Sequence, residues 1–156
     1  DVETPMVSIT QERCVTGSHS ISVAMDAVLT DINFDELDMI VLPGGGLGTQ
    51  NLEACEALMA QVDAFVAQGK PVAAICAAPS ILGHRGFLKG KRACSYPSFE
   101  SHLEGAEVVQ QPAVIDGNIV TGRGMGAAVP FALAVLEKLQ GADAAQKMAA
   151  QIVFEA

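Results

Sequence analysis

The chain has 156 residues, half of them hydrophobic and only 17% charged, which suits one globular domain with a dry core and excludes a disordered chain. Its formal net charge of −9 at pH 7 would repel nucleic-acid phosphates and anionic lipid, so neither partner is expected. No apolar run reaches the roughly 18 residues of a membrane-spanning helix.

The first half of the chain predicts short strands followed by one long helix. Strands are expected at 7–9 and 20–23, around a turn at 16–18. The continuous apolar run at 39–42 is typical of a strand that is buried on both faces in a parallel sheet. A helix is predicted over 51–68, with Asn51 as its cap and a glycine as its stop.

The second half alternates between the two kinds of element. Strands are predicted at 71–75, 92–95, 108–109, 113–115 and 119–121, and a hairpin turn at 116–118. Helices are predicted at 77–82, 97–103, 126–139 and 142–154, with Pro79 in the first turn of the first of these. This alternation predicts an α/β sandwich around a mostly parallel sheet, as a single domain over 1–156.

Cys76 lies where a predicted strand turns into a helix, with alanines on both sides. This arrangement is typical of a nucleophile elbow, with cysteine in place of serine and alanines in place of the usual glycines. A helix that begins behind the sulfur would favour the thiolate through its dipole. The alternative is a buried structural cysteine at a strand-to-helix junction.

Two further loops follow predicted strands at the same edge of the sheet, where α/β proteins gather function. Gly44 and Gly45 could turn backbone N–H groups toward an oxyanion, or form a plain strand-ending turn. They do not form a phosphate loop, because no Gly-Lys-Ser/Thr follows. Arg123 lies in a glycine-rich turn, where it could hold a carboxylate or aldehyde oxygen or serve as a surface ion-pair partner.

Four cysteines and three histidines are scattered along the chain without metal-ligand spacing. We therefore expect no metal site and free thiols rather than disulfides, which points to a reducing, cytoplasmic compartment. Of the histidines, His84 and His102 are expected to face solvent.

Several segments together resemble the DJ-1 branch of the ThiJ/PfpI superfamily over nearly the whole chain. The matching segments are 40–45, 47–52, 73–79, 96–97 and 121–126. The resemblance implies a flavodoxin-like three-layer sandwich, a homodimer, and a reactive cysteine that maps onto Cys76. It also implies chemistry without a metal or organic cofactor.

The chain departs from that family in two places. The family begins with a strand and helix that carry a glutamate beside the cysteine, and nothing in this sequence corresponds to them. We therefore expect the chain to be the larger part of a longer protein. Tyr96 stands where close relatives often have histidine, and a tyrosine is no base at neutral pH. His19 follows Gly17 and Ser18, where relatives present polar or basic residues to the partner's site, so it is either a site residue or a surface loop residue.

These observations predict a cysteine-dependent, cofactor-free enzyme that acts on dicarbonyls such as methylglyoxal or on their protein adducts. Cys76 would form a thiohemiacetal, and the N–H groups of Gly45 and Ala77 would hold its oxyanion. The family's glutamate, with His19, would move protons, and Tyr96 and Arg123 would bind substrate. The alternative is a redox-sensing or chaperone-like stress protein that uses oxidation of the same cysteine. A glutaminase- or protease-like hydrolase would need a Cys–His pair that the sequence does not offer.

Overall fold

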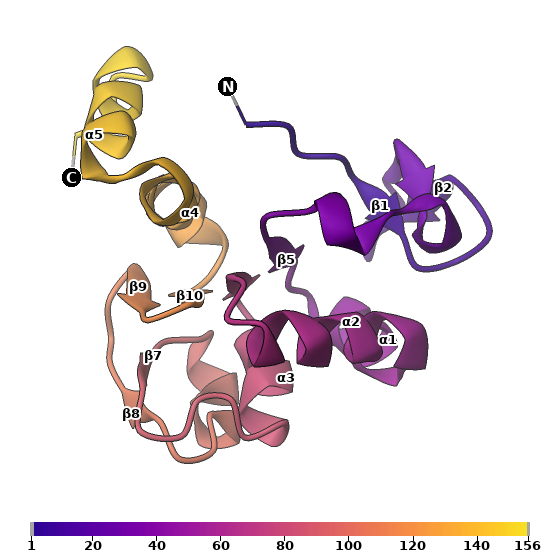
Figure 1. Cartoon of the computed structure of the whole chain (residues 1–156), viewed down its shortest axis with the longest axis horizontal. Coiled ribbons are helices and arrows are strands. Elements are labelled where there is room, and N and C mark those ends of the chain that lie inside the picture. Colours follow the sequence, from indigo (N-terminus) through magenta and orange to yellow (C-terminus); the bar gives the residue numbers. More distant parts are fainter. Residues whose placement is uncertain (1, 156) are drawn as a thin grey trace.

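The computed structural model describes residues 2–155, and within them the largest sheet has four strands in the order β5-β6-β10-β9 (Figure 1). Their bounds are β5 (Ile40–Leu42), β6 (Val72–Ile75), β10 (Ile119–Gly122) and β9 (Ala113–Asp116). Strands β5, β6 and β10 run parallel, whereas β9 runs antiparallel to β10 through the predicted turn. The α/β architecture with a mostly parallel sheet is therefore confirmed.

Strand β6 is the centre of this sheet and fixes its register. Val72 pairs with Ile40 on one side and with Ile119 on the other. The carboxyl ends of β5, β6 and β10 consequently meet at one edge of the sheet, which is where parallel α/β folds build their sites. The residues that follow at this edge belong to the Gly44 loop, the Cys76 turn and the Arg123 loop.

Helices cover both faces of the sheet and make it the middle of three layers (Figure 1). One face carries α1 (Gly46–Ala54), α2 (Glu56–Ala67) and α3 (Pro79–His84), and the other carries α4 (Ala128–Gln140) and α5 (Ala142–Gln151). Alternate residues of β6 serve the two layers, because Val72 and Ala74 pack with the α2 and α3 side and Ala73 packs with Phe131 of α4. Both cores consist of apolar side chains.

The helix predicted over 51–68 is in fact two helices, and the prediction of Asn51 as its cap is wrong. Helix α1 begins after Gly45, whose φ of +99° supplies the turn without any side-chain cap, so no cap residue marks this start in the sequence. Cys55 is extended between α1 and α2, and this break lets Leu52 and Cys55 both pack against the core. The predicted stop is confirmed, since Gly69 has a φ of +72° just beyond α2.

The N-terminal segment forms two small pairs of strands. β1 (Val7–Ser8) pairs in parallel with β4 (Ala27–Val28), and β2 (Cys14–Thr16) forms an exposed hairpin with β3 (Ser22–Ala24). Two short 3-10 turns, η1 (Leu29–Asp31) and η2 (Phe34–Glu36), lead from β4 to the main sheet.

Strand β5 corrects the expectation that the run at 39–42 is buried on both faces. Ile40 and Leu42 are 7% and 1% exposed, but Val41 between them is 45% exposed. The reason is that α4 packs over β6, β9 and β10, so the outermost strand β5 lies beyond its cover on that face.

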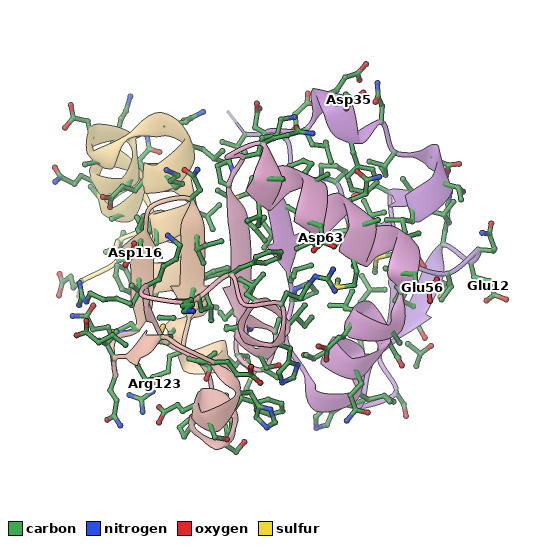
Figure 2. The ribbon with its side chains drawn as sticks, turned by 60° about the horizontal axis from the view of Figure 1, so that its bottom comes forward. Glu12, Asp35, Glu56, Asp63, Asp116 and Arg123 are labelled. Carbon is green, nitrogen blue, oxygen red and sulfur yellow. The ribbon has the colours of Figure 1, made fainter. Side chains whose placement is uncertain are left out.

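The remaining elements are short. They are β7 (Arg92–Ala93), η3 (Pro97–His102), β8 (Glu107–Val108) and η4 (Met125–Ala127). Figure 2 shows the acidic side chains of Glu12, Asp35 and Asp116 in well-separated parts of the molecule. No helix within the described residues is long and apolar enough to cross a membrane.

Candidate active site at the Cys76 turn

Cys76 occupies a strained turn directly after β6. Its φ of +66° lies in the left-handed region, which costs a residue with a Cβ roughly 1–2 kcal/mol. Two backbone hydrogen bonds hold it there: its N–H donates to the carbonyl of Gly122 at 2.9 Å, and its carbonyl accepts from the N–H of Tyr96 at 2.8 Å. The thiol-bearing residue is thus fixed from both sides while remaining partly exposed.

Gly44 lies against this turn so closely that no other residue fits. A Cβ at Gly44 would lie 2.5 Å from the Cβ of Cys76 and 2.7 Å from the carbonyl oxygen of Ile75. The glycine loop after β5 therefore contacts the Cys76 turn directly. Sequence spacing predicts that these loops share an edge of the sheet, and the structure brings them into contact.

Two backbone N–H groups that directly follow Cys76 and Gly44 in the chain are available as donors. Neither Gly45 N–H nor Ala77 N–H donates a hydrogen bond within residues 2–155. Ala77 is 1% exposed, so its N–H has little access to water. A nearly buried donor without a partner is uncommon and favours a role toward a bound oxygen atom.

The helix behind Cys76 is shorter and starts later than the sequence suggests. Ala77 and Ala78 form a turn, and α3 begins at Pro79 and has six residues. The predicted dipole directly behind the sulfur is corrected accordingly, because the turn separates the two. The N–H groups of that turn are nearer to Cys76 than the helix proper.

Tyr96 is brought to the same edge of the sheet by its bond to Cys76. Its ring lies along Gly124, since a Cβ there would be 3.5 Å from Cδ2 of the tyrosine, and the residue is half exposed. The structure therefore brings together the Gly44 loop, Cys76, Tyr96 and the end of β10, where Gly122 accepts the hydrogen bond from Cys76 N–H.

The side chain of Arg123, labelled in Figure 2, is occupied elsewhere. Its Nη2 lies 3.7 Å from Oε1 of Glu100, in η3, which is the ion-pair role that the sequence left open. That carboxylate oxygen is buried and accepts no hydrogen bond within residues 2–155. Glu100 is a residue that sequence reasoning missed, because nothing in its spacing connects it with Arg123.

His19 lies on the exposed β2–β3 hairpin. Its Nδ1 lies 3.1 Å from Oγ of Ser18, and no interaction within residues 2–155 joins it to Cys76. His84 and His102 are partly exposed as expected, but they also form a hydrogen-bonded pair that sequence reasoning missed.

All four cysteines are free, in agreement with the sequence-based expectation. Cys94 is 1% exposed, and its thiol donates to the carbonyl of Thr121. Burial raises the pKa of Cys94, and the hydrogen bond with Thr121 opposes this only in part. A buried thiol of that kind is a poor nucleophile, and Cys76 is the cysteine held on a strained turn.

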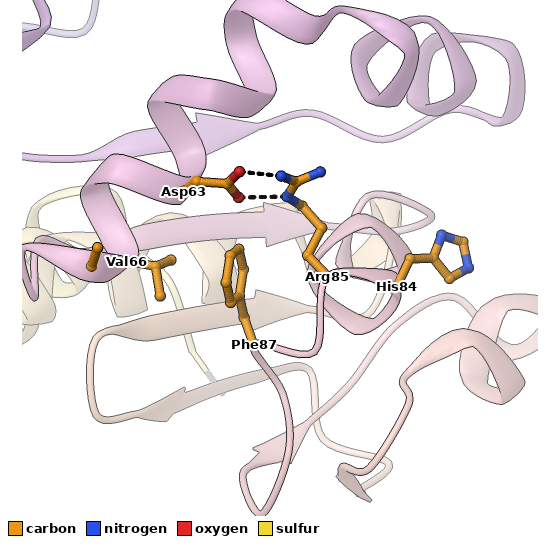
Figure 3. A pocket seen from close by; sticks show the side chains of 6 residues that line it. Asp63, Val66, His84, Arg85 and Phe87 are labelled. Carbon is orange, nitrogen blue, oxygen red and sulfur yellow. Dashed lines mark hydrogen bonds and ion pairs between the residues drawn. The ribbon is translucent and has the colours of Figure 1, made fainter.

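A shallow pocket of about 510 Å³ opens elsewhere, between α2 and the end of α3 (Figure 3). Its main polar groups, Asp63 and Arg85, are joined to each other by two hydrogen bonds. They are therefore less available to a ligand, and Cys76 does not line this pocket. No group of three or more histidine, cysteine or acidic side chains within the described residues could hold a metal ion.

Comparison with known proteins agrees with this geometry. The family model described as the DJ-1/PfpI family matches residues 1–138. The chain belongs to the DJ-1/PfpI family. The oxidized DJ-1 of Toxoplasma gondii superimposes with a TM-score of 0.90 at 31% identity, covering 97% of this chain and 83% of that one. Drosophila melanogaster DJ-1beta gives a TM-score of 0.84 at 32% identity, covering 92% and 78% of the two chains.

Curated DJ-1/PfpI relatives differ in length and in name. Protein DJ-1 homolog A of Arabidopsis thaliana is 36% identical over 152 residues, which are 96% of this chain but 39% of that protein. Deglycase PfpI of Pyrococcus furiosus is 36% identical over 114 residues, which are 72% of this chain and 68% of that protein. The chain thus spans well under half the length of the Arabidopsis relative, and the family shares its fold across proteins of several sizes.

Proposed function

We propose that this chain acts as a cysteine-dependent, cofactor-free enzyme on reactive dicarbonyls such as methylglyoxal, or on their protein adducts. The observation that carries the proposal is Cys76 at a φ of +66°, beside the unpartnered N–H groups of Gly45 and Ala77. Relatives such as the Pyrococcus furiosus protein are named deglycases, which supports the same substrate class.

In the proposed reaction, the Cys76 thiolate attacks the aldehyde carbon of methylglyoxal. The C–S bond forms as the carbonyl electron pair moves onto oxygen, and Gly45 N–H and Ala77 N–H donate to that oxyanion. A base then removes the C1 proton of the hemithioacetal, and an acid returns a proton to C2, which gives the lactoyl thioester. Water hydrolyses the thioester, which releases lactate and regenerates the thiol.

The proton carriers in this proposal are the glutamate of the family's N-terminal strand and helix, together with His19. His19 would act across a homodimer, because its hairpin is exposed and presents apolar side chains such as Val15, Ile21 and Val23. Tyr96 would donate its phenol hydrogen to a substrate oxygen. Arg123 would bind a second oxygen, in competition with Glu100.

A second function is favoured by one specific observation. The Toxoplasma gondii relative was solved as an oxidized DJ-1. In a redox-sensing role, two equivalents of hydrogen peroxide would convert the Cys76 thiol to sulfinate and release two waters. The same two N–H groups would then stabilise the sulfinate oxygens.

An assay of methylglyoxal loss without glutathione tests the enzymatic proposal, with Cys76→Ser as the variant and Cys14→Ser as the control with an exposed thiol. We expect Cys76→Ser to lose at least about a hundredfold in turnover and the control to lose none. Retained activity in Cys76→Ser would rule out the covalent mechanism. Absence of turnover even in a chain extended by the family's N-terminal strand and helix, combined with a peroxide-driven gain of two oxygen atoms on Cys76, would favour the redox function instead.

A further inference from the structure

Glu53, His84 and His102 form a continuous chain of hydrogen bonds on the surface. Oε1 of Glu53 lies 2.7 Å from Nδ1 of His84, and Nε2 of His84 lies 2.9 Å from Nδ1 of His102. The side chains of Glu53 and His84 are only about one-third exposed. Both ring nitrogens of His84 are therefore used, which is unusual for a histidine at the surface.

The three residues come from the three segments that follow the loops of the candidate site. Glu53 is in α1, which begins directly after Gly44 and Gly45. His84 ends α3, which follows Cys76, and His102 ends η3, which follows Tyr96. The hydrogen-bond chain thus links the three elements whose starting points form the site.

Close packing holds the two imidazoles in this arrangement. The rings of His84 and His102 meet edge to face, with centroids 5.1 Å apart and planes at 76°, and Phe99 lies 5.8 Å from His102 on its own element. Gly83 abuts the carbonyl of His102, and a Cβ at that position would overlap it. Because α3 and η3 are in backbone contact here, loss of the His84–His102 bond would weaken the packing of the two elements against each other.

The number of protons on the two imidazoles determines whether the His84–His102 hydrogen bond can persist. Between the two imidazoles one nitrogen must donate and the other must accept. The bond therefore survives when the pair is neutral or carries one added proton, but two imidazolium rings would bring two N–H groups face to face across 2.9 Å. Histidine is the side chain whose charge ordinarily changes between about pH 5 and 8, so acidification through that range is the condition that tests this limit.

The charged groups around the pair do not remove this limit. Glu53 is the carboxylate that contacts the pair. The neighbouring Arg85 is turned away toward Asp63 of α2, as Figure 3 shows. Its hydrogen bond to Asp63 is the main cause that raises the pKa of Arg85, and Glu53 adds to it at longer range. Asp63 therefore pairs with Arg85, and Glu53 is the carboxylate that faces the two imidazoles.

We infer that Glu53, His84 and His102 are positioning residues that hold the Gly44 loop, the Cys76 turn and Tyr96 together only while the imidazole pair carries at most one added proton. This inference rests on the proposed function for its effect on turnover, but the structural switch itself does not. Acidification adds the second proton, breaks the His84–His102 bond and loosens η3. The Tyr96 N–H to Cys76 carbonyl bond then opens more often.

Two measurements on the unaltered protein test the switch without any assay of activity. In a pH titration followed by NMR, the imidazole signals of His84 and His102 should change together and in two steps, because the two rings share one hydrogen bond. Exchange of the Tyr96 amide, corrected for the intrinsic pH dependence of exchange, should become at least about tenfold faster between about pH 7.5 and 5.5. Independent one-step changes of the His84 and His102 signals, or unchanged Tyr96 protection, would overturn the inference.

A matched pair of variants then connects the switch to the site. His102→Asn keeps a hydrogen-bonding group near Nδ1 but cannot take up a proton, and His19→Asn is the control for removal of an exposed imidazole. His102→Asn should abolish the acid-induced exchange of Tyr96 and flatten the acidic side of the kcat profile, while His19→Asn should leave the exchange unchanged. Acid-induced exchange that persists in His102→Asn would contradict the inference. If exchange behaves as expected but no variant turns over dicarbonyls, the proposed function fails and the switch stands.

Discussion

At the scale of single residues, the site depends on backbone positions that tolerate almost no change. Cys76 is kept at a positive φ by bonds from β10 and Tyr96, and Gly44 fills the space beside it. Strain of this kind persists only where the surrounding structure imposes it. Substitutions in the glycine loop are therefore expected to separate into tolerated and damaging ones within three residues.

Gly44→Ala should damage both folding and chemistry. The new Cβ would overlap Cys76 and the carbonyl of Ile75, so the loop must shift, at a cost of about 1–3 kcal/mol. Gly46→Ala is the control, because nothing lies within 4 Å of its Cβ position and it begins α1. Urea unfolding and iodoacetamide labelling of Cys76 measure the two effects. Equal stability and equal labelling rates in the two variants would show that Gly44 does not contact the turn as described.

The buried thiol of Cys94 should lower the free energy of unfolding at alkaline pH. Its pKa is raised by burial, so the folded protein holds the thiol proton more tightly than the unfolded chain does. The unfolded state then binds fewer protons above the ordinary thiol pKa of about 8.5, and stability falls as pH rises from there toward the raised folded value. Unfolding free energies measured between about pH 7 and 10 should fall more steeply for the unaltered protein than for Cys94→Ala. Parallel curves would remove this thiol as the cause.

At the scale of elements, the sequence predicts the strands and turns that are determined by residues close together in the chain. Short-range alternation and turn chemistry predict three such features. These are the apolar runs of β5 and β6, the Asp116–Asn118 turn and the strand-to-helix position of Cys76. The break at Cys55 did not, because helical spacing continues through it and only packing against the core favours two helices. The links Glu53–His84–His102 and Arg123–Glu100 join segments that are far apart in the chain, so spacing could not reveal them.

Substitution of Gly83 tests the contact between α3 and η3. Replacement of glycine by alanine within a helix is ordinarily favourable by about 0.5–1 kcal/mol. At Gly83 the new Cβ would overlap the carbonyl of His102, so Gly83→Ala should destabilise the protein by about 1–3 kcal/mol despite the gain in propensity. Gly48→Ala in α1, where nothing lies within 4 Å, should follow the propensity and stabilise. A stabilising Gly83→Ala, measured by thermal or urea unfolding, would show that η3 is free to move off α3.

At the scale of the whole molecule, the main sheet has an open side. β5 is its last strand within residues 2–155, and Val41 is 45% exposed on it. A strand edge with an apolar face ordinarily needs cover in a stable protein. We propose that the strand and helix with which the family begins would lie along β5, and that their glutamate would thereby reach Cys76.

An N-terminally extended chain is the test of that arrangement. A protonated glutamate that donates to the Cys76 thiolate would stabilise it by roughly 1.5–3 kcal/mol. An ordinary thiol is only about 3% ionised at pH 7, so this stabilisation corresponds to about ten- to thirtyfold more thiolate there. An ionised glutamate would act in the opposite direction through like-charge repulsion. We therefore expect a chain extended by the family's strand and helix to react with iodoacetamide at Cys76 about ten- to thirtyfold faster at pH 7 than the 156-residue chain, and to turn over methylglyoxal faster.

The matched control is the same extended chain with leucine in place of that glutamate, which keeps the added strand and removes the donor. It should unfold at the same urea concentration as the extended chain but label Cys76 as slowly as the 156-residue chain. The prediction would be contradicted if all three chains labelled Cys76 and turned over methylglyoxal at equal rates. In that case a residue within 1–156 would already supply the proton transfer. His19, on its exposed hairpin, and Tyr96, bonded to Cys76 through its N–H, would then be the residues to substitute next.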